Sequence, residues 1–233
     1  MPKEITVTLY SFKELLEGTN KQAAEKARQW LQDQNTYDGW AETVMEEWKN
    51  EFLNAIGFER ADICWTGFSN QGDGSSFTAQ INLTKVIEFF TATITPTQGV
   101  NGDKPQDYYN FVAYQLGYRE PVILGNNNYK AILPQTTDFT VSIYRSCHRY
   151  CHENSCKIES FNNMHEKTPD YEKVTVQFND LMIKLEELRY NLSKIIYQQL
   201  EAEYTHATSD EALLELAEAN DFQFMADGTH FKG

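Results

Sequence analysis

The sequence has no segment suited to entering or crossing a membrane. No apolar stretch approaches the length needed to span a bilayer, and residues 1–30 contain no unbroken apolar core of the kind that signal peptides have. Cysteine is also scarce, with four in 233 residues, three of which lie close together as Cys147, Cys151 and Cys156. So few cysteines are more typical of a protein in a reducing compartment than of a secreted domain held together by disulfides. We therefore expect a soluble cytoplasmic protein.

The sequence is also poor in positive charge. Lys and Arg number 20 against 34 Asp and Glu, which leaves a formal net charge of −14. Proteins that bind nucleic acid rely largely on Lys and Arg, which displace counterions from the phosphate backbone. We therefore expect no direct binding of DNA or RNA.

Recognisable catalytic motifs are missing. The sequence contains no Gly-x-Ser-x-Gly, no His-Glu-x-x-His and no Walker motif. The run from Cys147 to Cys156 has residue types that bind zinc, but it lacks a second pair of ligands a dozen or so residues away. We expect no catalysis, no metal and no cofactor, although a site assembled from distant residues would leave no motif. The role of Cys147, Cys151 and Cys156 stays open.

Apolar periodicity predicts an α+β fold. Apolar and polar residues alternate in two pairs of segments, which favours antiparallel hairpins at about 62–83 and 139–161. Helical spacing predicts helices over 12–32, interrupted at 18–20, and over 38–55. We expect the sheet to pack with these N-terminal helices and with a long C-terminal helix.

Shorter elements are expected between these segments. Residues 5–10 are typical of a short strand. Helices are predicted at 84–90 and 105–116, and a loop at 125–128. A glycine-rich loop, 67–77, joins the strands of the first hairpin, where glycines suit a tight turn and polar side chains can close it.

The C-terminal third contains the longest helical pattern. A helix is predicted from 168 to about 205, because Thr168 suits the N-cap and Pro169 suits the first helical position. Its apolar residues follow steps of four and three, typical of a heptad seam: Val174, Phe178, Leu181, Leu185, Leu188, Leu192 and Ile195. This seam would either pack within the chain or form a homodimer through 174–195, and the pattern supports both.

Two domains are expected, an α+β body at 1–166 and a C-terminal part at 167–233. The C-terminal part would hold the long helix, a second helix at 209–220 and a terminal hairpin turned at Asp227-Gly228. Thr208 and Glu211 stand in the relation of a capping box at the start of that second helix. We expect the C-terminal part to pack on the body or to serve dimerisation.

Acidic residues cluster in two regions, at about 38–60 and 196–233. Such clusters are commonly solvated helix faces that keep a protein dispersed, but they also suit docking on a basic surface in place of a nucleic-acid backbone. We take docking as the functional prediction, and its expected binding residues are Glu42, Glu46, Glu47, Glu201, Glu203, Asp210, Glu211, Glu215 and Glu218.

Several runs resemble a family of uncharacterised bacteriophage and prophage proteins. They are Trp65–Phe77 with its Gln-Gly-Asp-Gly turn, Tyr150–Ser155, Thr208–Ala212, Ala219–Phe224 and Asp227-Gly228. No catalytic residues accompany the resemblance. It implies a small accessory protein made in the cytoplasm of an infected host cell, for which interference with a host defence system is a common role.

The functional prediction is therefore an anti-CRISPR or anti-restriction type inhibitor. It would bind a host defence protein or nuclease complex on a basic, nucleic-acid-handling surface through its acidic helices. One alternative is a binder that sequesters an anionic nucleotide signal of host immunity, with Ser69, Gln71, Asp73, Ser75, Arg145, His148, Tyr150 and His152 as ligand-binding residues. An uncharacterised enzyme is the second alternative.

Overall fold

The chain forms two compact units, which are described separately. The computed structural model describes residues 7–35, 39–100, 102–147 and 149–232. We call residues 1–43 with 200–233 the helical unit, and residues 44–199 the α+β unit. This grouping joins the two ends of the chain, whereas the expected domains divide it at residue 166. The long helix α6 (Tyr171–Ala207) contributes residues to both units.

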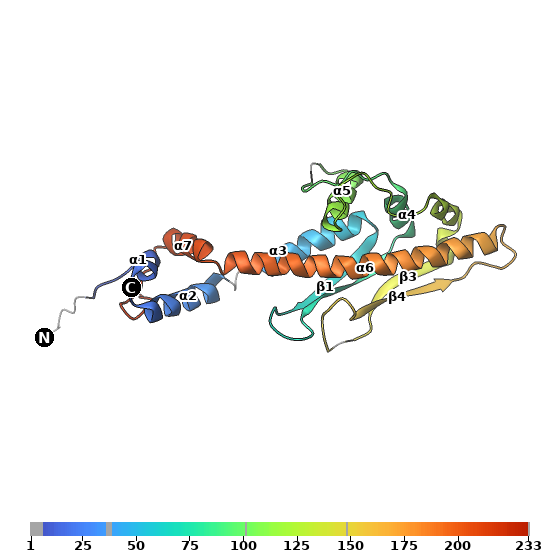
Figure 1. Cartoon of the computed structure of the whole chain (residues 1–233). Helices are drawn as coiled ribbons and strands as arrows, with labels where there is room; N and C mark the ends of the chain where they lie inside the picture. Colours follow the sequence, from blue (N-terminus) through green and yellow to red (C-terminus); the bar gives the residue numbers. More distant parts are fainter. Residues whose placement is uncertain (1–6, 36–38, 101, 148, 233) are drawn as a thin grey trace. The chain divides into compact units, whose positions relative to one another are not determined.

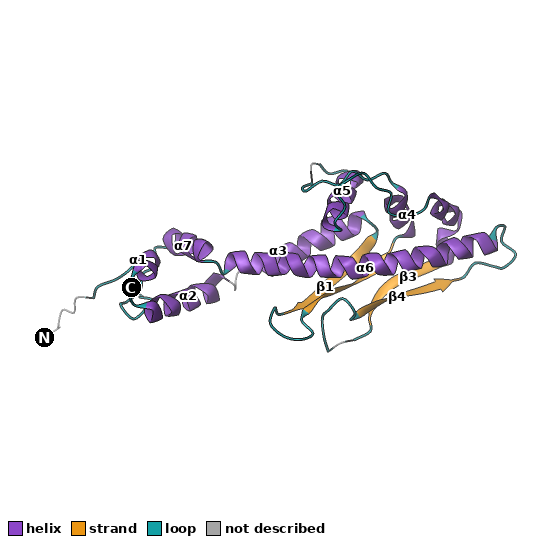
Figure 2. Ribbon diagram, in the orientation of Figure 1, coloured by secondary structure: helices purple, strands orange, loops and turns teal. Residues whose placement is uncertain are grey.

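A four-stranded antiparallel sheet forms the centre of the α+β unit (Figures 1 and 2). The strands follow the order of the chain: β1 (Phe58–Thr66), β2 (Gly74–Ile81), β3 (Phe139–Arg145) and β4 (Cys156–Asn162). Thr66 pairs with Gly74 at the end of the first hairpin, and Arg145 pairs with Cys156 at the end of the second. Both predicted hairpins and the α+β class are confirmed.

Helix α6 packs on one face of this sheet. Ser75 Oγ donates a hydrogen bond of 2.6 Å to the backbone oxygen of Ser193, and the rings of Phe139 and Phe178 stack 4.0 Å apart. All seven residues of the heptad seam are buried within the chain. A homodimer through 174–195 stays a prediction, and it would require this packing to open. Among the described residues, no helix combines the length and apolarity needed to cross a bilayer.

The expected start of the long helix is wrong by two residues, because its first helical residue is Tyr171 and not Pro169. Asp170 adopts a positive φ of 60°, which is incompatible with a right-handed helix. Thr168 and Pro169 therefore form a turn, in which the Tyr171 N–H donates to the Thr168 oxygen, and α6 begins at Tyr171.

Several further helices belong to the α+β unit. They are α3 (Trp40–Glu47), which continues as the π-helix η1 (Trp48–Leu53), α4 (Leu83–Thr91), α5 (Pro105–Gln115) and the 3-10 helix η2 (Asn127–Asp138). Helix α3 itself begins in the helical unit, whose last residue in this part of the chain is Thr43. The helices predicted at 38–55, 84–90 and 105–116 are confirmed within the described residues. The loop expected at 125–128 is wrong in its second half, because η2 begins at Asn127.

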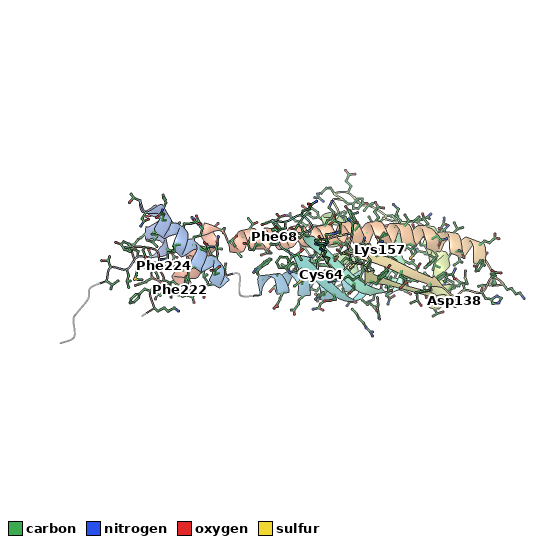
Figure 3. All side chains as sticks on the ribbon, turned by 90° about the horizontal axis from the view of Figure 1, so that it is seen from below. Cys64, Phe68, Asp138, Lys157, Phe222 and Phe224 are labelled. Carbon is green, nitrogen blue, oxygen red and sulfur yellow. The ribbon has the colours of Figure 1, made fainter. Side chains whose placement is uncertain are left out.

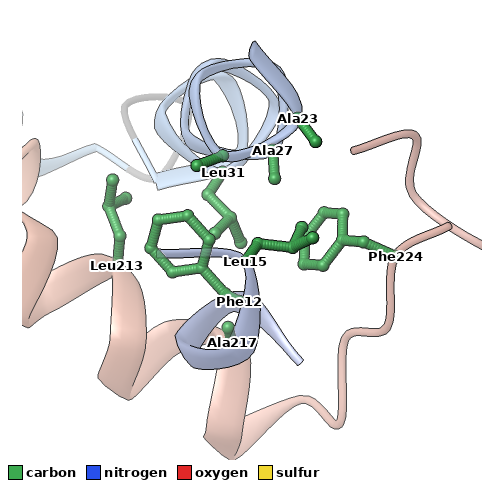
Figure 4. Packing of buried hydrophobic residues seen from close by; sticks show 9 residues of the cluster. Phe12, Leu15, Ala23, Ala27, Leu31, Leu213, Ala217 and Phe224 are labelled. Atoms are coloured by element: carbon green, nitrogen blue, oxygen red, sulfur yellow. The ribbon is translucent and has the colours of Figure 1, made fainter. Parts of the chain in front are cut away.

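Three short helices and the C-terminal segment build the helical unit. The helices are α1 (Phe12–Glu17), α2 (Lys21–Asn35) and α7 (Asp210–Ala219). The predicted break at 18–20 is confirmed between α1 and α2. Figure 4 shows their shared core, in which Phe12, Leu31, Leu213 and Phe224 face one another. Burial of these side chains joins residues that lie about 200 positions apart in the sequence.

Backbone pairing also connects the chain ends. Tyr10 and Phe224 exchange two hydrogen bonds of 2.8 and 2.9 Å, so the strand expected at 5–10 is reduced to one bridge in its described part. The terminal hairpin is confirmed, because Phe224 also pairs with His230 across the Asp227-Gly228 turn. The expected N-cap of α7 is wrong by one residue: Ser209 Oγ accepts from the Ala212 N–H, while Thr208 Oγ1 donates to the Tyr204 oxygen at the end of α6.

Candidate functional site

The nine acidic residues expected to bind a partner are all exposed and lie on three helices. Glu42, Glu46 and Glu47 lie on α3, Glu201 and Glu203 on α6, and Asp210, Glu211, Glu215 and Glu218 on α7. Glu46 and Glu47 belong to the α+β unit, and the other seven belong to the helical unit. The structure therefore brings only part of the set together.

Helix α7 gathers three of these carboxylates into one stripe. Glu211, Glu215 and Glu218 follow steps of four and three residues, which place them on one face of the helix. The opposite side buries Leu213 and Ala217 in the core of the helical unit. Among the described residues, no basic side chain lies within 4.0 Å of the three carboxylates. We call these three residues the α7 stripe.

Asp210 has a different role from its neighbours on α7. The Arg28 guanidinium on α2 donates to both of its carboxylate oxygens, at 2.7 and 3.0 Å. These charged hydrogen bonds hold the pKa of Asp210 below its ordinary value. The carboxylate thus ties α7 to α2. Sequence reasoning missed this pair, because 182 positions separate the two residues.

The acidic pair on α6 cannot form a second stripe. Glu201 and Glu203 are two residues apart, so they point to roughly opposite sides of the helix at 100° per residue. On α3, Glu42 and Glu46 share a face, but they belong to different units. The α7 stripe is therefore the predicted acidic surface with the clearest geometry.

The alternative ligand site is formed by the two hairpin loops of the α+β unit. A Cβ atom built on Gly72 would lie 2.9 Å from the Tyr150 ring, and one on Gly74 would lie 2.9 Å from the Cα of His152. Gly72 also adopts a φ of +99°, as the predicted tight turn requires. The structure thus places loop 67–73 against loop 146–155.

Three of the side chains expected to hold a nucleotide, those of Asp73, Ser75 and His152, have structural partners. Asp73 Oδ2 accepts from the N–H groups of Ser69 and Asn70, at 2.9 and 2.6 Å, and closes its own loop. Ser75 is buried against α6, and His152 Nδ1 accepts from the Asn154 N–H at 3.1 Å. These contacts reduce the polar groups left for a ligand. Gln71 and Tyr150 lie in these loops, Arg145 ends β3, and His148 lies outside the described residues.

Cys151 in the second loop lies near Cys64 on β1. Cys64 Sγ lies 3.2 Å from the Ser76 hydroxyl. Burial, and next the neighbouring Cys64, raise the pKa of Cys151 to about 11. A protonated thiol is a weak nucleophile and a weak metal ligand. Within the described part of the chain, no three His, Cys, Asp or Glu side chains are grouped to hold a metal ion.

The C-terminal segment docks closely on α2, which the sequence did not indicate. Gly228 has a φ of +80°, and a Cβ atom there would lie 2.0 Å from the Ala23 oxygen. Lys26 Nζ donates to Asp227 Oδ2 at 2.9 Å and to Thr229 Oγ1 at 2.5 Å. Figure 3 shows Phe222 and Phe224 close to each other in this segment. The Asp227-Gly228 turn is the sequence signal that could have indicated this close approach.

Comparison with known proteins identifies a family but no characterised relative. A family described as a domain of unknown function (DUF8835) matches residues 40–210, which span the whole α+β unit and reach the first residue of α7. No curated protein matches the chain. No solved structure matches it either.

Proposed function

The chain belongs to the family described as a domain of unknown function (DUF8835), and we propose that it is a non-catalytic binding protein. It docks the α7 stripe on a basic surface of another protein. The resemblance to phage proteins suggests the setting: an accessory protein in the cytoplasm of an infected cell, which blocks a host defence nuclease or CRISPR effector where that partner handles nucleic acid. The observation that supports this proposal most directly is the exposed stripe of Glu211, Glu215 and Glu218 without basic neighbours among the described residues.

Charge is concentrated in the helical unit. Its 77 residues contain 15 acids and 6 Lys and Arg, a net charge of −9, whereas the 156 residues of the α+β unit carry 19 acids and 14 Lys and Arg, a net charge of −5. An excess of one sign on a small unit produces a field that attracts an oppositely charged surface and speeds association. The helical unit is therefore the part of the chain best suited to meet a basic partner.

The α7 stripe is also preorganised. Ser209 caps the helix, the Arg28–Asp210 pair ties it to α2, and Leu213 anchors its inner face. The backbone of α7 is therefore already ordered before any partner binds, which lowers the entropic cost of association. Only the exposed Glu side chains need to be ordered on binding.

The spacing of the stripe suits groups that bind phosphates. At about 1.5 Å per residue, Glu211 and Glu215 are about 6 Å apart along the axis, and Glu215 and Glu218 about 4.5 Å. A nucleic-acid strand presents one charge about every 3.4 Å along its axis, so the stripe is a sparser row of the same sign. Arg and Lys side chains are long and flexible enough to engage carboxylates at this spacing.

The proposal is tested with a triple variant, Glu211→Gln, Glu215→Gln and Glu218→Gln. A control variant removes the same charge from exposed positions of the α+β unit: Glu159→Gln, Glu166→Gln and Glu172→Gln. Each protein is used for affinity capture from bacterial host cells, and the captured proteins are identified by mass spectrometry. The binding of nucleic acid by each captured protein is then measured alone and in the presence of the wild type or each variant.

We expect the wild type and the control to capture a nucleic-acid-handling protein and to compete with its nucleic acid. The triple variant should bind it about tenfold more weakly or worse. Binding should also be lost by about 0.5 M salt, where the screening length is about 4 Å. Equal binding by the triple variant and the wild type would refute the proposal. Release of a nucleotide from the heated protein would instead favour the sequestration alternative.

A further inference from the structure

The helical unit contains a cavity that none of the predicted sites uses. It measures about 520 Å³ and lies between the exposed face of α2 and the end of the C-terminal segment. Trp30 and Asp33 contribute from α2, and Thr229 and His230 from the segment. This volume is within the range of ordinary ligand pockets. An aromatic pair forms part of its wall, because the rings of Trp30 and His230 stack 3.9 Å apart at an angle of 11°.

The charges around this cavity leave one carboxylate unpaired. Lys26 lines the cavity, but its ammonium is held by Asp227 and Thr229. Glu25 also lines it and forms an ion pair with Arg28. Asp33 is exposed, and among the described residues no basic group lies within 4.0 Å of its carboxylate. The site therefore offers a negative charge one helical turn from an indole ring.

His230 adds a polar group without a partner. Its Nδ1 atom is buried, yet within the described residues it makes no hydrogen bond. Burial, and to a smaller extent Lys232, lower the pKa of His230. A lowered pKa favours the neutral form of the ring, which does not repel a cation. A buried polar atom of this kind is normally satisfied by water or by a ligand.

We infer that this cavity receives an arginine side chain of the basic protein partner, with the guanidinium against Trp30 and its N–H groups donating to Asp33. A planar guanidinium stacks on aromatic rings and forms paired hydrogen bonds with a carboxylate, whereas the compact ammonium of lysine does neither as well. The net charge of −9 on the helical unit favours a cationic occupant over an anionic one. This inference rests on the proposed function, which makes the partner basic.

The inference can be tested without knowing the partner. The full chain is titrated with N-acetyl-arginine-N-methylamide, and the signals of the Trp30 indole N–H and the His230 ring are followed by NMR. The matched probes are the lysine analogue and the citrulline analogue, which keeps the shape of arginine without its charge. The matched variants are Asp33→Asn, at the cavity, and Glu17→Gln, which removes an exposed acid elsewhere in the helical unit.

We expect the arginine probe to shift both signals, with a dissociation constant of about 30 mM, because one cation–π contact and one exposed ion pair together give only weak binding. Asp33→Asn should weaken binding about fivefold, and Glu17→Gln should leave it within about twofold. The citrulline probe should not shift the two signals. Equal shifts by lysine and arginine, or equal binding by Asp33→Asn and the wild type, would overturn the inference.

This test separates the inference from the proposed function. The triple variant of the α7 stripe should still bind the arginine probe, because its substitutions lie outside the cavity. If the stripe variant loses the protein partner and the cavity ignores arginine, the proposed function stands and the inference fails. If the cavity binds arginine and the stripe variant keeps its partner unchanged, the cavity's affinity for arginine stands and the proposed function of the stripe fails.

Discussion

Truncation of Phe224 to alanine tests whether the two chain ends form one folded unit. The ring is fully buried, 5.8 Å from Trp30 and 6.3 Å from Phe12, and the backbone of Phe224 pairs with Tyr10. Loss of a buried Phe side chain costs about 3–5 kcal/mol, since transfer energy is lost and a cavity remains. Single domains are stable by only about 5–15 kcal/mol, so Phe224→Ala should remove much of the stability of the helical unit.

Hydrogen exchange read by mass spectrometry locates this loss. Amides of α1, α2 and α7 should exchange faster by about two orders of magnitude or more, while those of β1–β4 keep their protection. Phe231→Ala is the matched control, because that ring is 36% exposed and should cost less than about 1 kcal/mol. A loss below 1 kcal/mol for Phe224→Ala, or equal loss of protection in the sheet, would show that the chain ends do not form a separate unit.

Three further predictions concern single contacts. Arg28 lowers the pKa of Asp210, so this ion pair stabilises the helical unit at pH values above 3.8, the ordinary pKa of Asp. The stabilisation is lost as the pH falls below that value and the carboxylate is protonated. Asp210→Asn should therefore make the thermal stability less sensitive to acid, as measured by thermal unfolding at pH 3–7. Arg189 is 2% exposed and donates to the Glu153 backbone oxygen. Arg189→Met should therefore lower the free energy of unfolding in urea by about 2 kcal/mol and speed hydrogen exchange in loop 146–155. If neither quantity changes, Arg189 does not hold this loop. Gly228→Ala should cost at least about 1–2 kcal/mol from its left-handed backbone alone, and unchanged exchange in the C-terminal segment would contradict this.

The fold of the α+β unit was largely predictable from local patterns. Alternation at period two marked the hairpins, and the steps of four and three marked α6 together with the face that it buries. These patterns succeed because the covered face of an element must be apolar along its length. They failed at Asp170, where the backbone takes a positive φ that a favourable Thr-Pro-Asp start does not indicate.

The helical unit was not predictable in the same way. Each of its helices has an apolar face, but nothing in a local pattern says which other face covers it. The pairing of Tyr10 with Phe224 and of Lys26 with Asp227 joins residues about 200 positions apart. The cavity beside Trp30 and His230 depends on the same long-range docking, so it could not be expected from either segment alone.

The acidic residues show most clearly what a charge pattern omits. In the sequence, Asp210 and Glu211 are equivalent carboxylates at the start of one helix. In the structure, Asp210 is bonded to Arg28 within the unit, whereas Glu211 faces outward with Glu215 and Glu218. Substitution of Asp210 would therefore change stability before it changes a partner contact, and a charge-reversal experiment that included it would confuse the two effects. The α7 stripe separates them, since its three carboxylates hold nothing together among the described residues.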